Sequence, residues 1–277
     1  MISIVMTVYN VENHLEKAIN SVLNQEYSDI ELILVNDCST DNSVSIINSF
    51  SDSRIKYISN EVNMGAGYSR KVGIESASGE YIITIDGDDW VEPDFLKNLY
   101  YNSENCDMVF GSMVFDFNNG DVKYFDTSFG IFSGVDKLEL VKNKKIIFLN
   151  TCLVKRELYD KVSYDTKRYN EDTPTLIKLL CFSDKIKIVK EFGYHYIQHN
   201  VSLCSSTDVF YKHLCLLLTT LDIMDFFDEY YPNLQNFVSV NDLFIHMSYL
   251  TDENLVIQHQ DLFNTAMLKF FKRIHRE

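Results

Sequence analysis

The first part of the chain alternates between two hydrophobic periods, and this alternation constrains the fold more than any other sequence feature. Short apolar runs rich in β-branched residues are separated by segments of helical periodicity. The expected strands are Ile2–Val8, Ile30–Val35, Ile55–Ile58 and Tyr81–Ile85, and the expected helices are Asn13–Asn24, Asp41–Phe50 and Ala66–Ala77. Short buried strands joined by helices are typical of βαβ units. We therefore predict an α/β fold with a mostly parallel, Rossmann-like sheet flanked by helices.

The pattern changes twice further along the chain. Strand and helix patterns are mixed over 106–204, with expected strands at Met108–Phe117, Val122–Phe125, Phe148–Val154 and Gly193–Gln198, and expected helices at Val135–Lys142 and Thr173–Cys181. The remainder is helical, with expected helices at Val209–Tyr230, Leu234–Leu250 and Leu255–Ile274. We therefore divide the chain into three regions, 1–105, 106–204 and a C-terminal helical region, 205–277.

Charge and composition exclude several classes of protein. The 277 residues carry a net charge of −15, which argues against a nucleic-acid partner held by phosphate contacts. The start of the chain lacks a basic segment and is interpreted as a buried strand, and no apolar run approaches the roughly 18 residues of a membrane helix. The six Cys residues show no CxxC spacing, which favours reduced thiols. These features predict a cytoplasmic protein.

Polar clusters follow three of the expected strands directly. They are Thr7–Asn10, Asn36–Asp41 and Asp86–Asp89. Ligands of parallel α/β sheets bind beyond the carboxyl ends of the strands, where loops converge. The sequence therefore predicts a ligand site at this edge of the sheet.

The acidic run Asp86-Gly87-Asp88-Asp89 is the strongest of these signals. Carboxylates packed this closely repel one another unless a cation compensates them, and oxygen ligands suit a hard divalent ion that also binds phosphate. The alternative is an acidic turn or a helix N-cap, with Asp89 or Asp94 as the capping residue. The neighbouring polar clusters favour the cation site.

Asp37 and Arg70 are candidate nucleotide contacts. Asp37 ends the second strand, where an acid accepts hydrogen bonds from a base or ribose, although capping of the helix at Asp41 explains it equally well. Arg70 and Lys71 follow Gly65 and a second glycine at a loop–helix junction, a favourable place for phosphate.

Two later segments carry candidate catalytic groups. Asp172, in Asn170-Glu171-Asp172, is either a general base or an acid that stabilises a helix start. His195 and His199 share one segment, and either of them is a candidate to ligate a metal or neutralise a diphosphate. A histidine with a structural role is the alternative for both, and spacing does not separate them.

Taken in order, these segments resemble the family 2 glycosyltransferases of the GT-A fold. Val35-Asn-Asp-Cys-Ser-Thr-Asp41 is similar to V-D-D-G-S-T-D, and Ser78–Asp89 is similar to G-E-Y-I-x-F-L-D-S-D-D. Weaker similarities lie at Ile4–Asn10, Asn63–Ile74, Asn170–Asp172 and Tyr196–Ser202. The resemblance covers residues 2–204 and leaves 205–277 outside.

The resemblance implies an activity and a set of roles. It implies inverting transfer from a UDP-sugar to a saccharide or lipid-linked saccharide acceptor in bacterial surface polysaccharide or glycoconjugate synthesis, with 1–105 as the donor half and 106–204 as the acceptor half. Thr7, Tyr9 and Asp37 would hold uracil and ribose, Arg70 would lie by the nucleotide, Asp86 by the ribose, and Asp89 would shape the loop or the donor sugar site. Asp88 would bind Mn²⁺ or Mg²⁺, His199 would contact the metal or diphosphate, and Asp172 would be the catalytic base.

The sequence departs from the family pattern at Asn36, Cys38, Lys71 and Ile197, where Asp, Gly, Asn and Arg are usual. The acid set is intact and argues for an active enzyme. The alternative is a non-catalytic nucleotide-sugar-binding or scaffold protein.

The last helix, with Met267, Phe271 and the cations Lys269, Lys272 and Arg273, has three interpretations. It packs on the protein, it forms a homodimer contact, or its basic face meets anionic membrane at the cytoplasmic surface.

Overall fold

A computed structural model describes most of the chain. The described residues are 1–117, 120–143, 145, 148–164, 166, 171–190, 193–198, 209–231, 250, 256, 258 and 260–274. The chain forms two compact units, one of residues 1–167 and 175–199 and the other of residues 168–174 and 200–277. Of the expected helix Leu234–Leu250, only Leu250 lies among the described residues.

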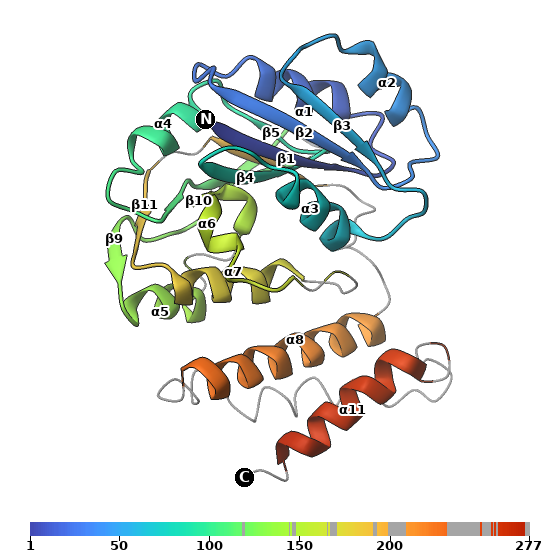
Figure 1. The fold of residues 1–277 in the computed structure, drawn as a ribbon, viewed down its shortest axis with the longest axis vertical. Helices are drawn as coiled ribbons and strands as arrows, with labels where there is room; N and C mark the ends of the chain where they lie inside the picture. Colours follow the sequence, from blue (N-terminus) through green and yellow to red (C-terminus); the bar gives the residue numbers. More distant parts are fainter. Residues whose placement is uncertain are drawn as a thin grey trace. The chain divides into compact units, whose positions relative to one another are not determined.

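A large mixed sheet organises the first unit (Figure 1). Its parallel half has the order β3-β2-β1-β4 and consists of β1 (Ile2–Val8), β2 (Ile30–Asn36), β3 (Ile55–Ser59) and β4 (Tyr81–Asp86). The sheet continues from β4 through β10 (Cys152–Lys155), β6 (Met108–Phe110), β11 (Lys185–Ile188) and β9 (Gly130–Ser133) to eight strands. Only β10 and β9 run antiparallel to their neighbours in this sheet. The predicted α/β fold with a mostly parallel sheet is confirmed.

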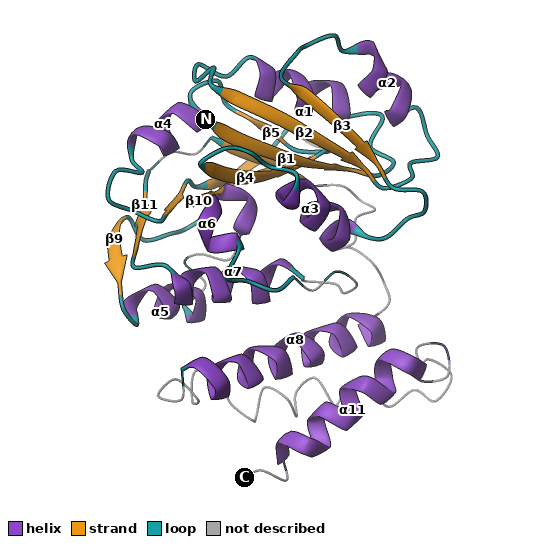
Figure 2. Ribbon diagram, viewed as in Figure 1, coloured by secondary structure: helices purple, strands orange, loops and turns teal. Residues whose placement is uncertain are grey.

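Alternation of side chains along the strands gives the parallel half two covered faces (Figure 2). One face contributes Ile4, Leu32 and Ile83 to a core with α1 (Leu15–Leu23), α2 (Ser43–Ser49) and α4 (Phe95–Tyr101). The opposite face carries α3 (Ala66–Glu75), which packs on β1 and β2. A Cβ at Gly73 would lie only 2.2 Å from Val5 Cγ1, so this close helix–strand approach requires a glycine.

A second sheet of four strands lies in the same unit. Its order is β5 (Trp90–Val91), β12 (Tyr194–Gln198), β7 (Met113–Phe117) and β8 (Val122–Tyr124). The single strand predicted for Met108–Phe117 is wrong, because the chain breaks at Gly111-Ser112 and its two halves join different sheets. The strand expected at Phe148–Val154 starts later, since a 3-10 helix, η1 (Leu149–Thr151), precedes β10. The remaining helices of the mixed region are α5 (Asp136–Lys142), α6 (Arg156–Tyr159) and α7 (Asp172–Phe182).

The second unit contains two described helices, α8 (Val209–Tyr230) and α11 (Gln260–Ile274). Leu214, Leu217 and Leu221 of α8 form one core with Ala266 and Phe270 of α11. Lys269 and Arg273 form ion pairs with Asp222 and Asp228 of α8. Of the three interpretations of the last helix, packing within the chain is the one observed here. None of the described helices is both long and apolar enough to span a bilayer.

Candidate active site

Strand register brings the polar residues after β1, β2 and β4 to the same side of the sheet. Thr7 lies opposite Asp86 in β4 and opposite Val35 in β2. Asp37 follows Val35 by two positions, and its backbone N–H continues the ladder by donating to Val8 O at 2.8 Å. Residues two apart share a face of a strand. Thr7, Asp37 and Asp86 therefore meet on the face that α3 covers, at the carboxyl ends of the parallel strands.

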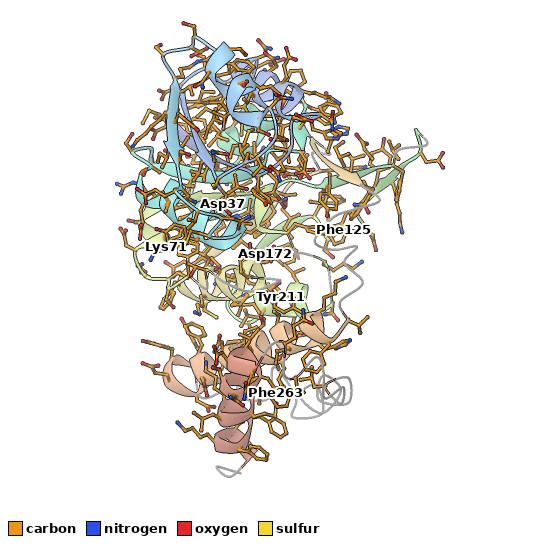
Figure 3. All side chains as sticks on the ribbon, turned by 90° about the vertical axis from the view of Figure 1, so that its right-hand side faces the viewer. Asp37, Lys71, Phe125, Asp172, Tyr211 and Phe263 are labelled. Atoms are coloured by element: carbon orange, nitrogen blue, oxygen red, sulfur yellow. The ribbon has the colours of Figure 1, made fainter. Side chains whose placement is uncertain are left out.

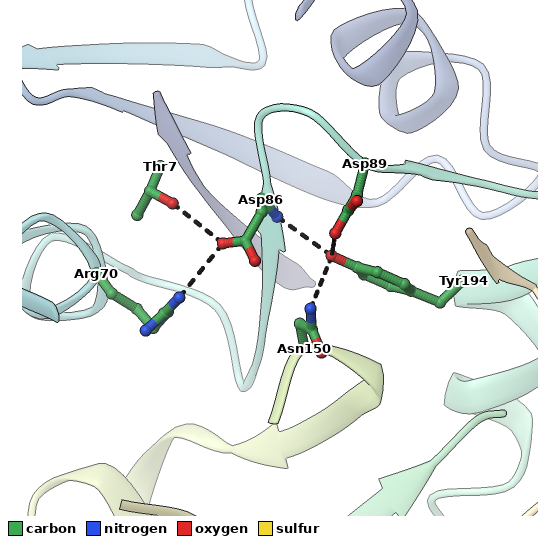
Figure 4. A network of polar contacts seen from close by, with 6 residues as sticks. All are labelled: Thr7, Arg70, Asp86, Asp89, Asn150 and Tyr194. Carbon is green, nitrogen blue, oxygen red and sulfur yellow. Dashed lines mark hydrogen bonds and ion pairs between the residues drawn. The ribbon is translucent and has the colours of Figure 1, made fainter. Parts of the chain in front are cut away.

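Asp86 is held by a hydroxyl and a guanidinium (Figure 4). Thr7 Oγ1 donates to Asp86 Oδ1 at 3.2 Å, and Arg70 Nη2 lies 3.3 Å from the same oxygen. Arg70 projects from α3 and is buried, whereas the Asp86 side chain keeps 30% of its surface exposed. The predicted residues Thr7, Arg70 and Asp86 thus form one cluster, with a carboxylate that is both oriented and accessible to a ligand.

Asp37, labelled in Figure 3, organises the loop that precedes α3. Its Oδ1 accepts hydrogen bonds from Asn60 Nδ2 and the Met64 backbone N–H, both at 2.8 Å, and its Oδ2 accepts one from the Gly65 N–H at 2.7 Å. The side chain is buried, and Gly65 has a φ of +89°, which disfavours a side chain there. Asp37 therefore positions the loop that leads to Arg70, and its contact with uracil or ribose remains a prediction.

Asp41, and not Asp37, stabilises the start of α2. Asp41 Oδ1 accepts the Ser43 N–H at 3.0 Å, and its Oδ2 accepts the Glu12 N–H at 2.9 Å. The second bond ties the loop after β1 to the loop after β2. The capping alternative considered for Asp37 is thereby excluded.

Tyr9 lies on this tethered loop and is 46% exposed. The next residue, Asn10, has a φ of 52°, and its Oδ1 accepts the Thr40 N–H at 2.8 Å. The loops after β1 and β2 thus form one polar wall with an exposed aromatic ring. The predicted contact of Tyr9 with the nucleotide remains a prediction.

The backbone at Cys38 keeps the conformation expected of the family motif, although the residue differs. Cys38 has a φ of 61°, the left-handed conformation that favours glycine, and the similar family motif carries glycine at this position. The backbone turn is therefore kept although the residue differs. All five described cysteines are free thiols, and Cys204 lies outside the described residues.

The acidic turn folds back over the end of β1. The Gly87 N–H donates to Thr7 O at 2.9 Å, and a Cβ at Gly87 would lie 2.8 Å from that oxygen, so the turn needs a glycine. Asp88 is partly exposed, whereas Asp89 is only 1% exposed. Burial raises the pKa of Asp89 well above its usual range, and the adjacent carboxylates Asp88 and Asp86 add to the rise.

Asp89 shapes the loop from a buried position. It accepts a hydrogen bond from Tyr194 OH at 2.7 Å and another from the Ile197 N–H at 2.9 Å. Neither Asp89 nor Asp94 makes a side-chain cap, because α4 starts after Asp94 without one. The cap alternative for the acidic run is excluded, and a part for Asp89 in a donor sugar site remains a prediction.

The acidic turn suits a divalent ion that takes few protein ligands. In the described part of the chain, no three His, Cys, Asp or Glu side chains converge as a metal-binding group. Asp88 is partly exposed between two other carboxylates, and a cation there would relieve their repulsion. Mg²⁺ commonly uses one or two protein carboxylates and takes its other ligands from phosphate and water. The residues present fit such an ion.

The structure distinguishes between the two candidate histidines, His195 and His199. His195 Nδ1 lies 3.1 Å from Asp116 Oδ2, and its Nε2 lies 3.1 Å from Glu92 Oε1. Its ring stacks on that of Trp90, with the two ring centroids 3.7 Å apart. Both ring nitrogens are engaged, so His195 has a structural role in the small sheet. His199 lies outside the described residues, and its predicted contact with metal or diphosphate remains a prediction.

Asp172, labelled in Figure 3, is the first residue of α7. Residues 168–174 belong to the second unit. An acid at a helix start agrees with the structural alternative, and the catalytic-base role remains a prediction. Two residues were absent from the predicted site: Tyr194, whose hydroxyl contacts Asp89 and the Asp86 N–H of the acidic turn, and Asn150, whose Nδ2 donates to Tyr194 OH at 3.0 Å. No local sequence signal marks this long-range contact.

Comparisons with known proteins agree on one family. The family model described as glycosyl transferase family 2 matches residues 3–163. Glycosyltransferase GlyA of Streptococcus pneumoniae is 31% identical over 211 residues, which are 70% of this chain and 30% of GlyA. UDP-Glc:alpha-D-GlcNAc-diphosphoundecaprenol beta-1,3-glucosyltransferase WfgD of Escherichia coli is 41% identical over 92 residues, 33% of this chain and 36% of WfgD.

A solved structure shares the fold. The crystal structure of residues 1–349 of S. aureus TarS in complex with UDP-GlcNAc aligns with a TM-score of 0.72 at 18% identity, covering 97% of this chain and 80% of that chain. At this level of identity the likeness concerns the fold, which is GT-A.

Proposed function

Because the chain belongs to glycosyl transferase family 2, we propose that it is a metal-dependent enzyme that moves a sugar from a UDP-sugar to an acceptor hydroxyl. The observation that carries the proposal is the cluster of Thr7, Arg70 and Asp86 beside the partly exposed Asp88. UDP is favoured as the nucleotide because WfgD is named for UDP-Glc and TarS was crystallised with UDP-GlcNAc. The chain spans less than a third of the length of GlyA.

The cluster would provide complementary contacts for a nucleoside diphosphate. The Asp86 carboxylate, oriented through one oxygen by Thr7 and Arg70, would accept hydrogen bonds from ribose hydroxyls. The Arg70 guanidinium, which pairs with Asp86, would offset part of the negative charge that repels phosphate from this acidic cluster. The exposed Tyr9 ring would stack on the base.

Asp88 would hold Mn²⁺ or Mg²⁺ on the diphosphate, with His199 as a further predicted contact. Such an ion, when bound, stabilises the negative charge that grows on a leaving diphosphate. Asp88 would fix the ion's position, and the tethered backbone of the turn on both sides would fix Asp88.

Asp172 would act as the general base. It would accept the proton of the acceptor hydroxyl while the acceptor oxygen forms a bond to the anomeric carbon. The bond from that carbon to the diphosphate oxygen would break on the opposite face and release UDP with inversion. A saccharide or lipid-linked saccharide acceptor is the proposed class, since WfgD is named for a diphosphoundecaprenol-linked acceptor.

A panel of nucleotide sugars tests the proposal. We expect the wild type to release UDP slowly from at least one UDP-sugar with Mn²⁺ and not with EDTA, and Asp88→Asn to lose this activity. Asp94→Asn is the matched control, because Asp94 is an exposed acid close by in sequence that makes no side-chain cap. Binding of a UDP-sugar without hydrolysis or transfer would instead support a non-catalytic binding protein. Absence of both binding and hydrolysis across the panel would refute the proposal.

A further inference from the structure

The buried phenol of Tyr194 joins three other segments of the first unit (Figure 4). Tyr194, at the start of β12, is 0% exposed. Its hydroxyl donates to Asp89 Oδ2 at 2.7 Å and accepts from Asn150 Nδ2 at 3.0 Å and from the Asp86 backbone N–H at 3.3 Å. One hydroxyl therefore connects β12 to the end of β4, to the acidic turn and to η1.

Asp89 extends the same connection along β12. Its second oxygen accepts the Ile197 N–H at 2.9 Å, three residues beyond Tyr194. A buried carboxylate is costly unless donors satisfy it, and here both oxygens have a donor from one strand. The acidic turn is thus fastened to β12 at two points, and Asp88 lies between the fastened residues Asp86 and Asp89.

We propose that Tyr194 is a positioning residue for sugar transfer, which acts by holding the Asp86–Asp89 turn so that Asp86 and Asp88 are correctly placed for nucleotide and metal. This inference rests on the proposed function. Tyr194 contributes no group to the reaction, because its hydroxyl is buried and engaged by protein groups.

The ring and the hydroxyl of Tyr194 have separable roles. The ring packs edge-on against Phe95, with the two ring centroids 6.3 Å apart. Phe95 also packs against the preceding residue, Gly193, where an added Cβ would lie only 2.6 Å from Phe95 Cδ2. Phenylalanine at position 194 would keep this packing and remove only the hydroxyl. The substitution would leave Asp89 Oδ2 without the Tyr194 donor, and Asn150 Nδ2 and the Asp86 N–H without the phenolic acceptor.

Tyr194→Phe is therefore the test variant, and Tyr81→Phe is its control. Tyr81 is also a buried phenol, but it lies at the opposite end of β4 and packs on Tyr100. Both variants are assayed for Mn²⁺-dependent UDP release below their unfolding temperatures. We expect Tyr194→Phe to lower kcat on the order of 10²-fold, as misplacement of reacting groups does, and to need more Mn²⁺ for half-maximal rate. Tyr81→Phe should stay within about twofold of the wild type, because its hydroxyl lies away from the turn.

A double-mutant cycle separates positioning from general destabilisation. If Tyr194 acts through Asp89, the double variant Tyr194→Phe/Asp89→Asn should lose little more activity than Asp89→Asn alone. Additive losses would mean that the two residues act independently, and would contradict the inference.

Hydrogen exchange tests the tether without any assay of activity. In Tyr194→Phe the amides of Asp86 and Ile197 should exchange faster than in the wild type, while those of α3 should not change. Unchanged exchange at both amides would refute the tether. Wild-type kcat and Mn²⁺ response in Tyr194→Phe would refute the positioning role while leaving the proposed function intact. A wild type that releases no UDP from any donor would instead refute the proposed function, and with it the positioning role.

Discussion

Replacing Gly73 by alanine has two effects of opposite sign on the free energy of unfolding. Gly73 lies inside α3, where alanine is the better helix former by about 1 kcal/mol. Its new Cβ, however, would lie 2.2 Å from Val5 Cγ1 and 3.2 Å from Val35 Cγ2. Carbon atoms in contact normally stay about 3.5–4.0 Å apart, so helix and strand would have to separate by roughly 1 Å or more.

The Val5 side chain has little freedom to move away from a new Cβ at position 73. It is fully buried in the middle of β1, and β-branched side chains are stiff about χ1. Overpacking of this kind costs about 1–3 kcal/mol, and so close an approach belongs at the upper end. Subtracting the gain in helix propensity leaves an expected loss of about 2 kcal/mol in the free energy of unfolding of the first unit.

The same displacement would act on the site. Arg70 lies one turn before Gly73 on α3, and its Nη2 is 3.3 Å from Asp86 Oδ1. A shift of roughly 1 Å would break this contact and leave Asp86 less well oriented. We therefore expect Gly73→Ala to weaken UDP binding as well as stability.

Urea unfolding and calorimetric titration with UDP and Mn²⁺ measure the two effects. Glu75→Ala is the control on the same helix, because Glu75 is exposed and its pairing with Lys71 at 3.7 Å contributes only about 0.5 kcal/mol or less. If Gly73→Ala were as stable as the wild type or more stable, with UDP affinity unchanged, the close packing of α3 on β1 would be refuted.

Further substitutions probe single features of the fold and site. Cys38→Gly should stabilise the protein by about 0.5–1 kcal/mol in urea unfolding, since it relieves a φ of 61° at a smaller cost in chain entropy; a destabilised variant would contradict this. Asp52→Asn should cost about 1 kcal/mol or less at pH 7, because hydrogen bonds from Arg54 lower the pKa of Asp52 to about 2 but the pair lies at the surface, where solvent screens it. This stabilisation is present above the unfolded-state pKa and is lost as pH falls through about 2, so urea midpoints of the two proteins should converge in acid; a constant difference would contradict the ion pair. Asp172→Asn should slow transfer to acceptor by about 10²–10⁴-fold and spare UDP binding by calorimetry; near-normal turnover would exclude the base role.

The parallel half of the sheet was predictable because its signal is local. The expected and observed bounds of β1 coincide at Ile2–Val8, since a mostly apolar, β-branched run ends at Tyr9-Asn10. Strand parity then places Thr7 and Asp86 on one face of the sheet, and the register observed in the structure sets them opposite each other. That Arg70 joins them depends on the packing of α3 on β1 and β2, which periodicity alone does not give.

The mixed region was harder because its pairings depend on distant partners. Met108–Phe117 has the composition of one strand, and only the Gly111-Ser112 pair marks the point where it leaves one sheet for another. The strand β9 was missed since three of its four residues are exposed and show no alternation. Asp89 looked like a ligand or a cap because its partners, Tyr194 and Ile197, lie more than a hundred positions along the chain. Its burial can be found only in the folded structure.

Paramagnetic broadening by Mn²⁺ tests whether the turn after β4 binds a nucleoside diphosphate through a divalent ion. Amide signals of the labelled protein are recorded with Mn²⁺ alone, UDP alone and both together. We expect the amide signals of Gly87, Thr7 and Arg70 to broaden strongly only when both are present, and we expect Asp88→Asn to abolish the effect while Asp94→Asn does not. Broadening centred on another part of the chain, or the same broadening in Asp88→Asn, would contradict it.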